Sequence, residues 1–335
     1  MDVFYAFNDA YAAMAGISIF SLLENSSSEE KIVFHIVDSG ISQENLSKLS
    51  ETILSHNQTV QFYKMPDFEQ LTGKKIDTGR WNINVFSKLF VGSILPEDVK
   101  KVICIDCDTV VMRSLNELWS TDIENKIVAG VIECISPLYR SNLGKQDSDY
   151  YFNSGLVFFN VEEMRKQRYE DKFWACMQKY GSSLAYLDQD VINAVVPQNQ
   201  MVLLHPKFNS ITPVFCLNYK DFMETRGARD YYSETEYVEA QNTPYIIHYT
   251  TFFLSGLRPW FEGSKHPKVG EFLKYKELSL WKDTLLWKDN RNAASKWKAA
   301  VIRIVPLFIL KPLVAYLHGT IVPRKNAKKM MEYES

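Results

Sequence analysis

Apolar runs of strand length alternate with stretches of helical periodicity along the first hundred residues. The pattern predicts strands at 2–7, 31–37, 59–63 and 99–105. It predicts helices from Asp9 to about Leu23, from Ser42 through Leu54, and over 84–94, with Asp9 and Ser42 as candidate N-caps. This β-α-β-α order predicts an α/β protein with a mainly parallel central sheet and helices on both faces.

The stretch VICIDCDTVV (102–111) contains a Cys-x-x-Cys and an Asp-x-Asp. Cys104 and Cys107 are three residues apart, so in an extended chain they face opposite sides of the strand. Their Cα atoms would then lie roughly 10 Å apart, whereas a disulfide needs about 4.4–6.8 Å. No second cysteine pair completes a zinc site. The pattern therefore disfavours a redox or zinc function for these thiols.

Asp106 and Asp108 are two residues apart and point to the same side while the chain stays extended. They follow a strand that is apolar on both faces, and ligands of open α/β sheets bind beyond the carboxyl ends of strands. Two carboxylates at that edge suit a hard divalent cation. The alternative is a polar turn that only ends the strand.

Three further segments carry candidate site residues. Asn153 and Ser154 precede the strand-like GLVFFN, with Gly155 allowing close approach of the backbone. Asp188, Gln189 and Asp190 stand at a predicted helix start, where one acid could serve only as a cap. His248 follows the strand-like PYII and would complete an Asp, Asp, His set, which favours Mn²⁺ over Mg²⁺.

Composition narrows the class of protein. The chain has 335 residues, 46% hydrophobic and 23% charged, as in globular proteins. Its net charge of −2 gives no reason to expect nucleic acid as a partner. Five scattered cysteines do not indicate a disulfide framework, and the N-terminal residues lack the basic region of a secretory signal. We therefore expect a cytoplasmic protein.

The C-terminal segment differs in charge from the rest. From Arg291 to the end there are nine Lys and Arg against two Glu. Residues 297–330 mix apolar runs with spaced cations, and contain no run of about 20 uncharged apolar residues. We expect a catalytic domain at 1–260 and a helical, basic, amphipathic segment at 261–335 that binds an anionic membrane surface peripherally, on the inner face of the plasma membrane. The alternatives are a terminal helix packed on the core and a dimer contact. The membrane interpretation predicts that a chain cut near residue 290 stays folded.

Six segments in order carry a family resemblance: FYAFNDAYA, FHIVDSGIS, ICIDCDTVV, YFNSGLVFFN, YLDQDVIN and HY…GLRPW. Between residue 2 and about 260 the chain resembles the family 8 glycosyltransferases, which are retaining enzymes of the GT-A fold. It is most similar in these motifs to bacterial lipooligosaccharide galactosyltransferases and to general-stress-protein A relatives.

The resemblance implies a set of roles. Asp106, Asp108 and His248 would hold Mn²⁺, with Mg²⁺ as an alternative, on the pyrophosphate of a UDP-sugar. The implied nucleotide-binding residues are Ala6, Asn8, Tyr11, Lys88, Asp106, Cys107, Gly256 and Arg258. The implied donor-sugar residues are Asn153, Ser154, Asp188 and Gln189. Gln189 and Asp190 are the candidates to stabilise a cationic anomeric carbon.

The implied reaction moves galactose or glucose to a saccharide or glycolipid acceptor of a surface glycan. Retention could use a covalent intermediate or front-face attack, and front-face attack is favoured because an amide is a poor nucleophile. The chain departs from the family pattern at Ala10, where Asn is common, and at Lys88, where Arg is usual. Both departures lend weight to an alternative, a non-catalytic sugar-nucleotide-binding scaffold, whereas the intact metal ligands argue against it.

Overall fold

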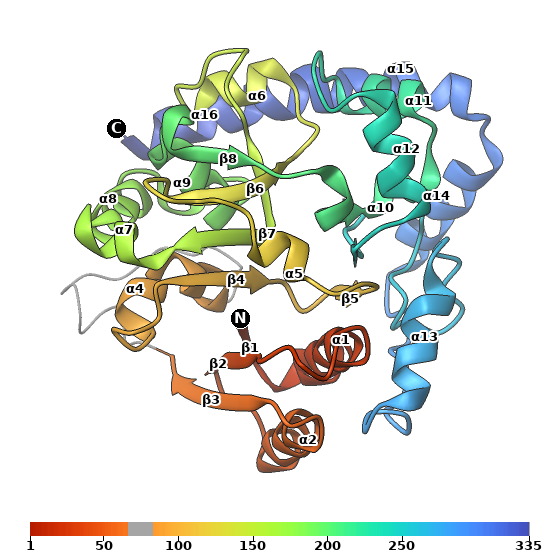
Figure 1. Ribbon diagram of the computed structural model, residues 1–335. Coiled ribbons are helices and arrows are strands. Elements are labelled where there is room, and N and C mark those ends of the chain that lie inside the picture. The colour runs from red at the N-terminus through yellow and green to blue at the C-terminus, as the bar shows by residue number, and fades with distance from the viewer. Residues whose placement is uncertain (66–82, 335) are drawn as a thin grey trace.

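The computed structural model describes residues 1–65 and 83–334. Its centre is a seven-stranded sheet in the order β3-β2-β1-β4-β7-β6-β8 (Figure 1). The strands are β1 (Asp2–Phe7), β2 (Val33–Asp38), β3 (Thr59–Lys64), β4 (Lys101–Ile105), β6 (Val128–Ile132), β7 (Phe152–Asn160) and β8 (Met201–Leu203). Strands β3, β2, β1 and β4 are parallel, β8 is parallel to β6, and β7 is antiparallel to β4 and β6. The predicted α/β class and mainly parallel sheet are confirmed.

The sheet separates two hydrophobic cores, and this explains why its central strands are apolar over most of their length. Val3, Tyr5 and Phe7 of β1 enter one core, together with helices α1 (Ala12–Glu24) and α2 (Gln43–Ser55). Phe4 enters the other core, with helices α8 (Tyr169–Tyr180) and α9 (Asp188–Val195). Successive side chains of a strand point to opposite faces, so a strand covered on both faces reads as a continuous apolar run.

The predicted helix starts have different outcomes. Ser42 caps α2 as predicted, its hydroxyl accepting from the amide of Asn45. The prediction for Asp9 is wrong, because α1 begins at Ala12 after a 3-10 turn (Asp9–Tyr11). The Asp9 carboxylate instead accepts from the Ser42 amide and from Asn45 Nδ2, each at 2.8 Å. Strands β1 and β2 are parallel neighbours, so the segments that follow them meet at one sheet edge.

The predicted helix over 84–94 consists of a 3-10 segment η2 (Ile83–Phe90) and a short helix α4 (Val91–Ile94). Phe86, Leu89 and Phe90 bury its apolar face in the second core, and Lys88 points to the opposite side, toward the edge of β4. A small second sheet, β5 (Thr109–Val111), β10 (Ile246–His248) and β9 (Ser210–Ile211), completes the fold beside this edge.

The segment after residue 260 continues the catalytic core. Helix α13 (Val269–Leu278) places Phe272 and Tyr275 in the first core, and Trp281 packs directly on Gly16 of α1. Only 1% of Trp281 is exposed, and its indole N–H donates to Asn45 Oδ1 at 2.9 Å. The expected domain boundary at 260/261 is therefore too early in the chain, because three large side chains beyond it fill the core of the catalytic domain.

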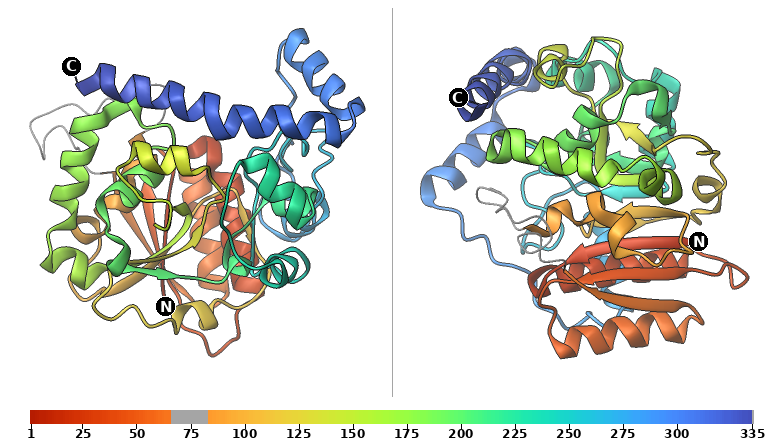
Figure 2. Two further views of the ribbon diagram at one scale, coloured as in Figure 1. Left: turned by 90° about the horizontal axis from the view of Figure 1, so that it is seen from above. Right: turned by 90° about the vertical axis from the view of Figure 1, so that its left-hand side faces the viewer.

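The C-terminal residues form consecutive helical segments, of which the first lies at one side of the molecule and the later ones cross its top (Figures 1 and 2). They are α14 (Ala293–Ile304), α15 (Leu307–Tyr316), the π-helical turn η6 (Leu317–Ile321) and α16 (Val322–Glu334). Helix α15 packs on α11 (Tyr219–Arg226), and α16 packs on α8 and on α6 (Pro137–Asn142). Met330 is buried, and Asn326 Nδ2 donates to the Ser183 carbonyl at 2.9 Å. A terminal segment packed on the core is thus what the structure shows.

Large apolar side chains are exposed on helices α14 and α15. Trp297 is 71% exposed, Phe308 72% and Tyr316 56%. In the described part of the chain no single helix is long and apolar enough to cross a membrane, although the bent pair Ala293–Ile302 and Leu307–Tyr333, at 118°, meets the length and composition requirement together.

Candidate active site

Strand register brings the site residues together. Strands β1 and β4 are parallel, so Asn8 and Asp106 leave the sheet at the same edge. Strand β7 runs antiparallel to β4 with Leu156 opposite Ile105, which places Gly155 beside Asp106; the Asp106 amide donates to the Gly155 carbonyl at 2.9 Å. In the small sheet His248 is paired with Thr109, next to Asp108.

The predicted metal ligands converge. Ligand atoms of Asp106, Asp108 and His248 all lie within 4.8 Å of one another. The His248 ring is buried, with Nε2 3.2 Å from Asp108 Oδ1 and Nδ1 3.0 Å from Asn209 Oδ1. A methyl group on Gly155 would overlap that ring, so the glycine predicted for close approach is needed here. Two carboxylates and one imidazole fit a divalent ion.

Two cations flank these ligands. Lys88 donates to Asp106 Oδ1 at 2.6 Å and to the Ser154 carbonyl at 2.8 Å, and lies 3.3 Å from Asp188 Oδ2. Burial alone would lower the pKa of Lys88, but the carboxylates of Asp106 and Asp188 raise it well above its ordinary value. Lys88 is therefore a permanent positive charge at this edge.

Arg258 holds the other carboxylate. Its Nη1 donates to Asp108 Oδ2 at 3.0 Å, and its Nη2 donates to Thr251 Oγ1 at 2.9 Å. Burial would raise the pKa of Asp108, but His248 and Arg258 hold it at about 2. Asp108 is consequently an anion throughout the physiological range, as a metal ligand must be.

A cavity of about 400 Å³ opens above these groups. It is lined by the predicted nucleotide residues Ala6, Asn8, Tyr11, Lys88, Asp106, Cys107 and Arg258, together with Asp188 and apolar neighbours. Asn8 Oδ1 is buried without a hydrogen-bond partner among the described residues, whereas Asp188 Oδ2 lies 3.3 Å from Lys88 Nζ. The volume fits a small-molecule site, and the Asn8 oxygen provides a contact for a ligand's donor. Gly256, with φ of 73°, is not among the lining residues.

Ser154 and Gln189, two of the predicted donor-sugar residues, are hydrogen-bonded to each other. Asn153 and Ser154 lie within β7 rather than before it. The Ser154 amide donates to Gln189 Oε1 at 3.0 Å, and Gln189 Nε2 donates to the Tyr151 hydroxyl at 3.2 Å. Gln189 is thus held in one orientation beside Asp188. Asp188 has a raised pKa, chiefly because it is buried.

Asp190 lies elsewhere. Asp190 is fully buried. Its carboxylate accepts from the Tyr151 hydroxyl at 2.6 Å, and from the Tyr139 hydroxyl and the Tyr186 amide at 2.8 Å each. Burial raises its pKa to about 6. The expectation that Asp190 acts at the anomeric carbon does not agree with this position, because all three donors come from the protein. Asp190 instead holds the tyrosine that orients Gln189.

The cysteines agree with the strand geometry. Cys104 and Cys107 are both free, and burial raises the pKa of each thiol. Sequence reasoning missed Tyr151, Asn209 and Glu133, which support the site from behind. Only Tyr151 had a sequence signal, as the residue before the Phe-Asn-Ser-Gly motif.

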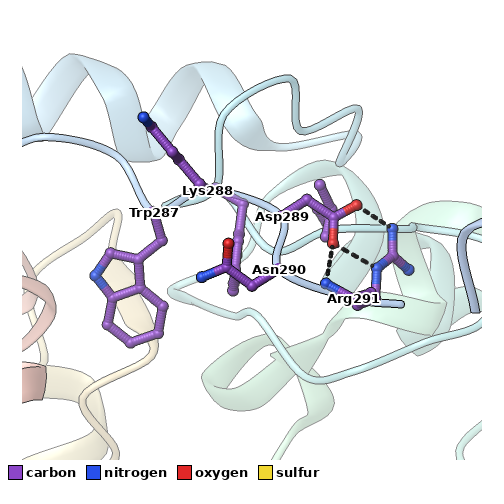
Figure 3. A pocket seen from close by; sticks show the side chains of 7 residues that line it. Trp287, Lys288, Asp289, Asn290 and Arg291 are labelled. Carbon is purple, nitrogen blue, oxygen red and sulfur yellow. Dashed lines mark hydrogen bonds and ion pairs between the residues drawn. The ribbon is translucent and has the colours of Figure 1, made fainter. Parts of the chain in front are cut away.

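A second, more open groove of about 690 Å³ lies beyond the Tyr11 wall of the cavity (Figure 3). Its lining residues are Leu257, Phe261, Trp287, Lys288, Asp289, Asn290 and Arg291. Trp287 packs edge-on against Tyr11, with ring centroids 5.8 Å apart, and Arg291 pairs with Asp289. The segment that leads to the C-terminal helices therefore supports the Tyr11 side of the cavity.

Comparison with known proteins agrees with this geometry. General stress protein A of Bacillus subtilis is 26% identical over 284 residues, covering 84% of this chain and 94% of the relative. Lipopolysaccharide 1,2-glucosyltransferase of Escherichia coli is 25% identical over 287 residues, covering 84% and 79%.

Solved structures show the same fold. The galactosyltransferase LgtC, crystallised with donor and acceptor sugar analogs, superposes with a TM-score of 0.69 at 21% identity, covering 89% of this chain and all of that one. The bifunctional glycosyltransferase WbbM also gives a TM-score of 0.69 at 21% identity, covering 84% of this chain and 50% of that one. The fold is therefore GT-A. A sequence model described as Glycosyl transferase family 8 matches residues 2–263, and the chain belongs to that family.

Proposed function

We propose that the protein transfers galactose or glucose from a UDP-sugar to a saccharide acceptor, with retention of configuration and with Mn²⁺. The observation that carries the proposal is the convergence of Asp106, Asp108 and His248 at the base of a nucleotide-sized cavity. One relative is a lipopolysaccharide glucosyltransferase and one structural neighbour is a galactosyltransferase, which supports a hexose donor and a surface-glycan acceptor.

The residues present suit departure of UDP. When bound, the divalent ion would offset the negative charge that develops on the diphosphate. Lys88 and Arg258 place two further cations at the same edge, where they would stabilise that charge. Lys88 supplies a point charge rather than the two-pronged contact of an arginine.

The surroundings of Gln189 support front-face attack. Its amide is a poor nucleophile and is already held by Ser154 and Tyr151, while Asp190 is enclosed by three donors. In this mechanism the acceptor hydroxyl bonds to the anomeric carbon on the side from which the phosphate departs. The sugar–phosphate bond breaks, and a phosphate oxygen takes the hydroxyl proton.

We also propose that the enzyme works peripherally at the cytoplasmic face of a membrane. Trp297 lies on α14 together with Lys296 and Lys298, and Phe308 and Tyr316 lie on α15. The helix that follows, α16, carries the exposed Lys325, Lys328 and Lys329. Aromatic anchors beside cations are typical of interfacial helices. A membrane-borne glycolipid acceptor would agree with such attachment.

The test is hydrolysis of a panel of UDP-sugars without acceptor. UDP-galactose or UDP-glucose should be hydrolysed in Mn²⁺, and Asp108→Asn should reduce turnover at least about a hundredfold by removing a charged ligand. Asp122→Asn, an exposed acid outside the cavity, is the matched control and should leave turnover unchanged. Full turnover in EDTA would contradict the proposal.

A further inference from the structure

A buried ion pair stands behind the donor-sugar residues. Glu133 follows strand β6 and is only 6% exposed, and Arg226 is the last residue of helix α11. The guanidinium contacts Glu133 Oε1, and its Nε donates to the Cys134 carbonyl at 2.8 Å. Burying two charges is costly, so such a pair is weak evidence for stability alone.

The pair is the first link of a hydrogen-bonded relay that ends at a predicted metal ligand. Asn153 Nδ2 donates to Glu133 Oε2 at 2.6 Å, and Asn153 Oδ1 accepts from Asn209 Nδ2 at 2.8 Å. Asn209, at the end of the short helix η5 (Pro206–Asn209), then presents Oδ1 to His248 Nδ1 at 3.0 Å.

Donor and acceptor are fixed in each hydrogen bond between Glu133 and His248. The Glu133 carboxylate can only accept, so Asn153 must turn its NH₂ toward it and its oxygen toward Asn209. Asn209 then donates to Asn153 and accepts from His248, which fixes the proton of the imidazole on Nδ1. The Nε2 lone pair is left facing Asp108 and the cation site. An outer hydrogen bond of this kind orients a histidine ligand and raises its basicity.

The C-terminal helices contact α11, the helix that carries Arg226 at the far end of this hydrogen-bond chain. Lys311 of α15 reaches Asp221 Oδ1 at 2.6 Å and Glu224 Oε2 at 2.7 Å, both on α11. A Cβ on Gly227, the residue after Arg226, would lie 2.9 Å from the Cα of Gly319 in η6. Figures 1 and 2 show α15 lying across α11. The terminal helices therefore help to hold the end of α11 that carries Arg226.

We infer that Glu133 and Arg226 are positioning residues that couple the seating of the C-terminal helix on α11 to the affinity of the Asp106–Asp108–His248 site for its cation. The inference rests on the proposed function, because it takes that cluster to be a divalent-metal site. The terminal helices would then help to position the cation ligands, in addition to any contact with a membrane.

The experiment measures Mn²⁺ binding by the full chain from the loss of the free-ion paramagnetic resonance signal. Glu133→Gln and Arg226→Met should each weaken Mn²⁺ affinity by about 10- to 100-fold, as outer-sphere changes do at other metal sites. Arg226→Lys should recover part of the loss because it restores the charge. Lys311→Met, at the outer clamp, should give a smaller loss in the same direction.

A matched control separates positioning from general stability. Arg165 is a partly buried arginine that lies away from the site. It donates to the carbonyls of Gly92, Leu95 and Val99. Arg165→Met should lower the unfolding temperature and leave Mn²⁺ affinity unchanged. If Arg226→Met does not fold, Glu133→Gln and Lys311→Met decide the question.

The outcomes distinguish the two proposals. Failure of the wild-type chain to bind Mn²⁺ would overturn the metal-dependent function and the relay with it. Normal binding by wild type, together with unchanged affinity in Glu133→Gln and Lys311→Met, would overturn the relay alone.

Discussion

At the scale of single residues, Gly155 decides whether His248 can reach the cation site. A Cβ at this position would overlap the imidazole and would lie 3.0 Å from Asn153 Oδ1. Gly155→Ala should therefore displace His248 and weaken Mn²⁺ binding at least about tenfold, because one ligand leaves its position. Titration of the purified protein with Mn²⁺ measures the effect.

The matched control is Gly270→Ala in α13, where no atom lies within 4 Å of the added methyl group. Gly270 is the second residue of α13, and alanine loses less conformational freedom than glycine on folding, so this variant should be slightly more stable and bind Mn²⁺ normally. Equal Mn²⁺ affinity in both variants would show that His248 is not a ligand.

His266 gives the fold a pH dependence. Its Nδ1 accepts from the Lys268 amide and its Nε2 lies 3.1 Å from Thr212 Oγ1, so the ring is held neutral. Burial, followed by the charge of Lys268, lowers its pKa from 6.5 to about 4. Because the pKa of His266 is lowered by folding, the neutral ring contributes fully to the free energy of unfolding above pH 6.5. This contribution is lost as the pH falls from 6.5 to 4.

Urea unfolding at pH 7 and pH 5 tests this prediction. His266→Gln should lose about 2 kcal/mol less than wild type between the two pH values, because glutamine takes up no proton. If the free energy of unfolding of His266→Gln falls as much as that of wild type between pH 7 and pH 5, the ring is already protonated in the folded chain at pH 5.

At the scale of elements, α1 depends on a side chain that follows the expected domain boundary. Trp281 fills a space against Gly16 and donates to Asn45 of α2. Trp281→Ala should lower the free energy of unfolding by about 3–5 kcal/mol, as other large-to-small core substitutions do. Leu285→Ala, at a residue that is 86% exposed, should change it by less than about 0.5 kcal/mol. Equal stability of the two variants would show that residues after 260 are dispensable for the core.

At the scale of the whole molecule, the C-terminal helices have one side packed on the core and one side exposed. Arg324, Lys325, Lys328 and Lys329 could together contribute roughly 4 kcal/mol at an anionic surface. The full chain should therefore co-sediment with vesicles that contain anionic lipid and be released as salt rises. Replacing both Trp297 and Phe308 by serine should reduce this binding at least about tenfold, because two exposed anchors are lost.

Leu285→Ser is the control for this experiment, since it removes an exposed apolar side chain outside the terminal helices. Equal and negligible co-sedimentation of all three proteins would contradict the membrane proposal. A chain cut near residue 290 is a poorer test, because it would expose the faces of α8 and α11 that the terminal helices cover.

The sequence by itself determined the four strands β1 to β4 of the large sheet and the acidic residues that follow β4. Strands buried on both faces read as apolar runs, and Asp106 and Asp108 follow such a run at the carboxyl end of β4. Ligands of open α/β sheets bind at that edge, so the carboxylate pair could be predicted from local patterns. His248 ends β10 of the separate small sheet, and its place beside Asp108 depends on the antiparallel pairing of β10 with β5. The motifs and their order also carried the family, which the family match confirmed.

The tertiary structure alone decided which polar residues face the cavity and which are enclosed. Asp190 has the same local setting as Asp188, but Tyr139 and Tyr151, 51 and 39 residues away in the chain, enclose it. Arg226 meets Glu133 across 93 residues, and Trp281 meets Asn45 across 236. Periodicity reports which side of an element is covered; it carries no information on the distant segment that covers it. The partners of a buried polar group are set by packing, and packing is a property of the whole chain.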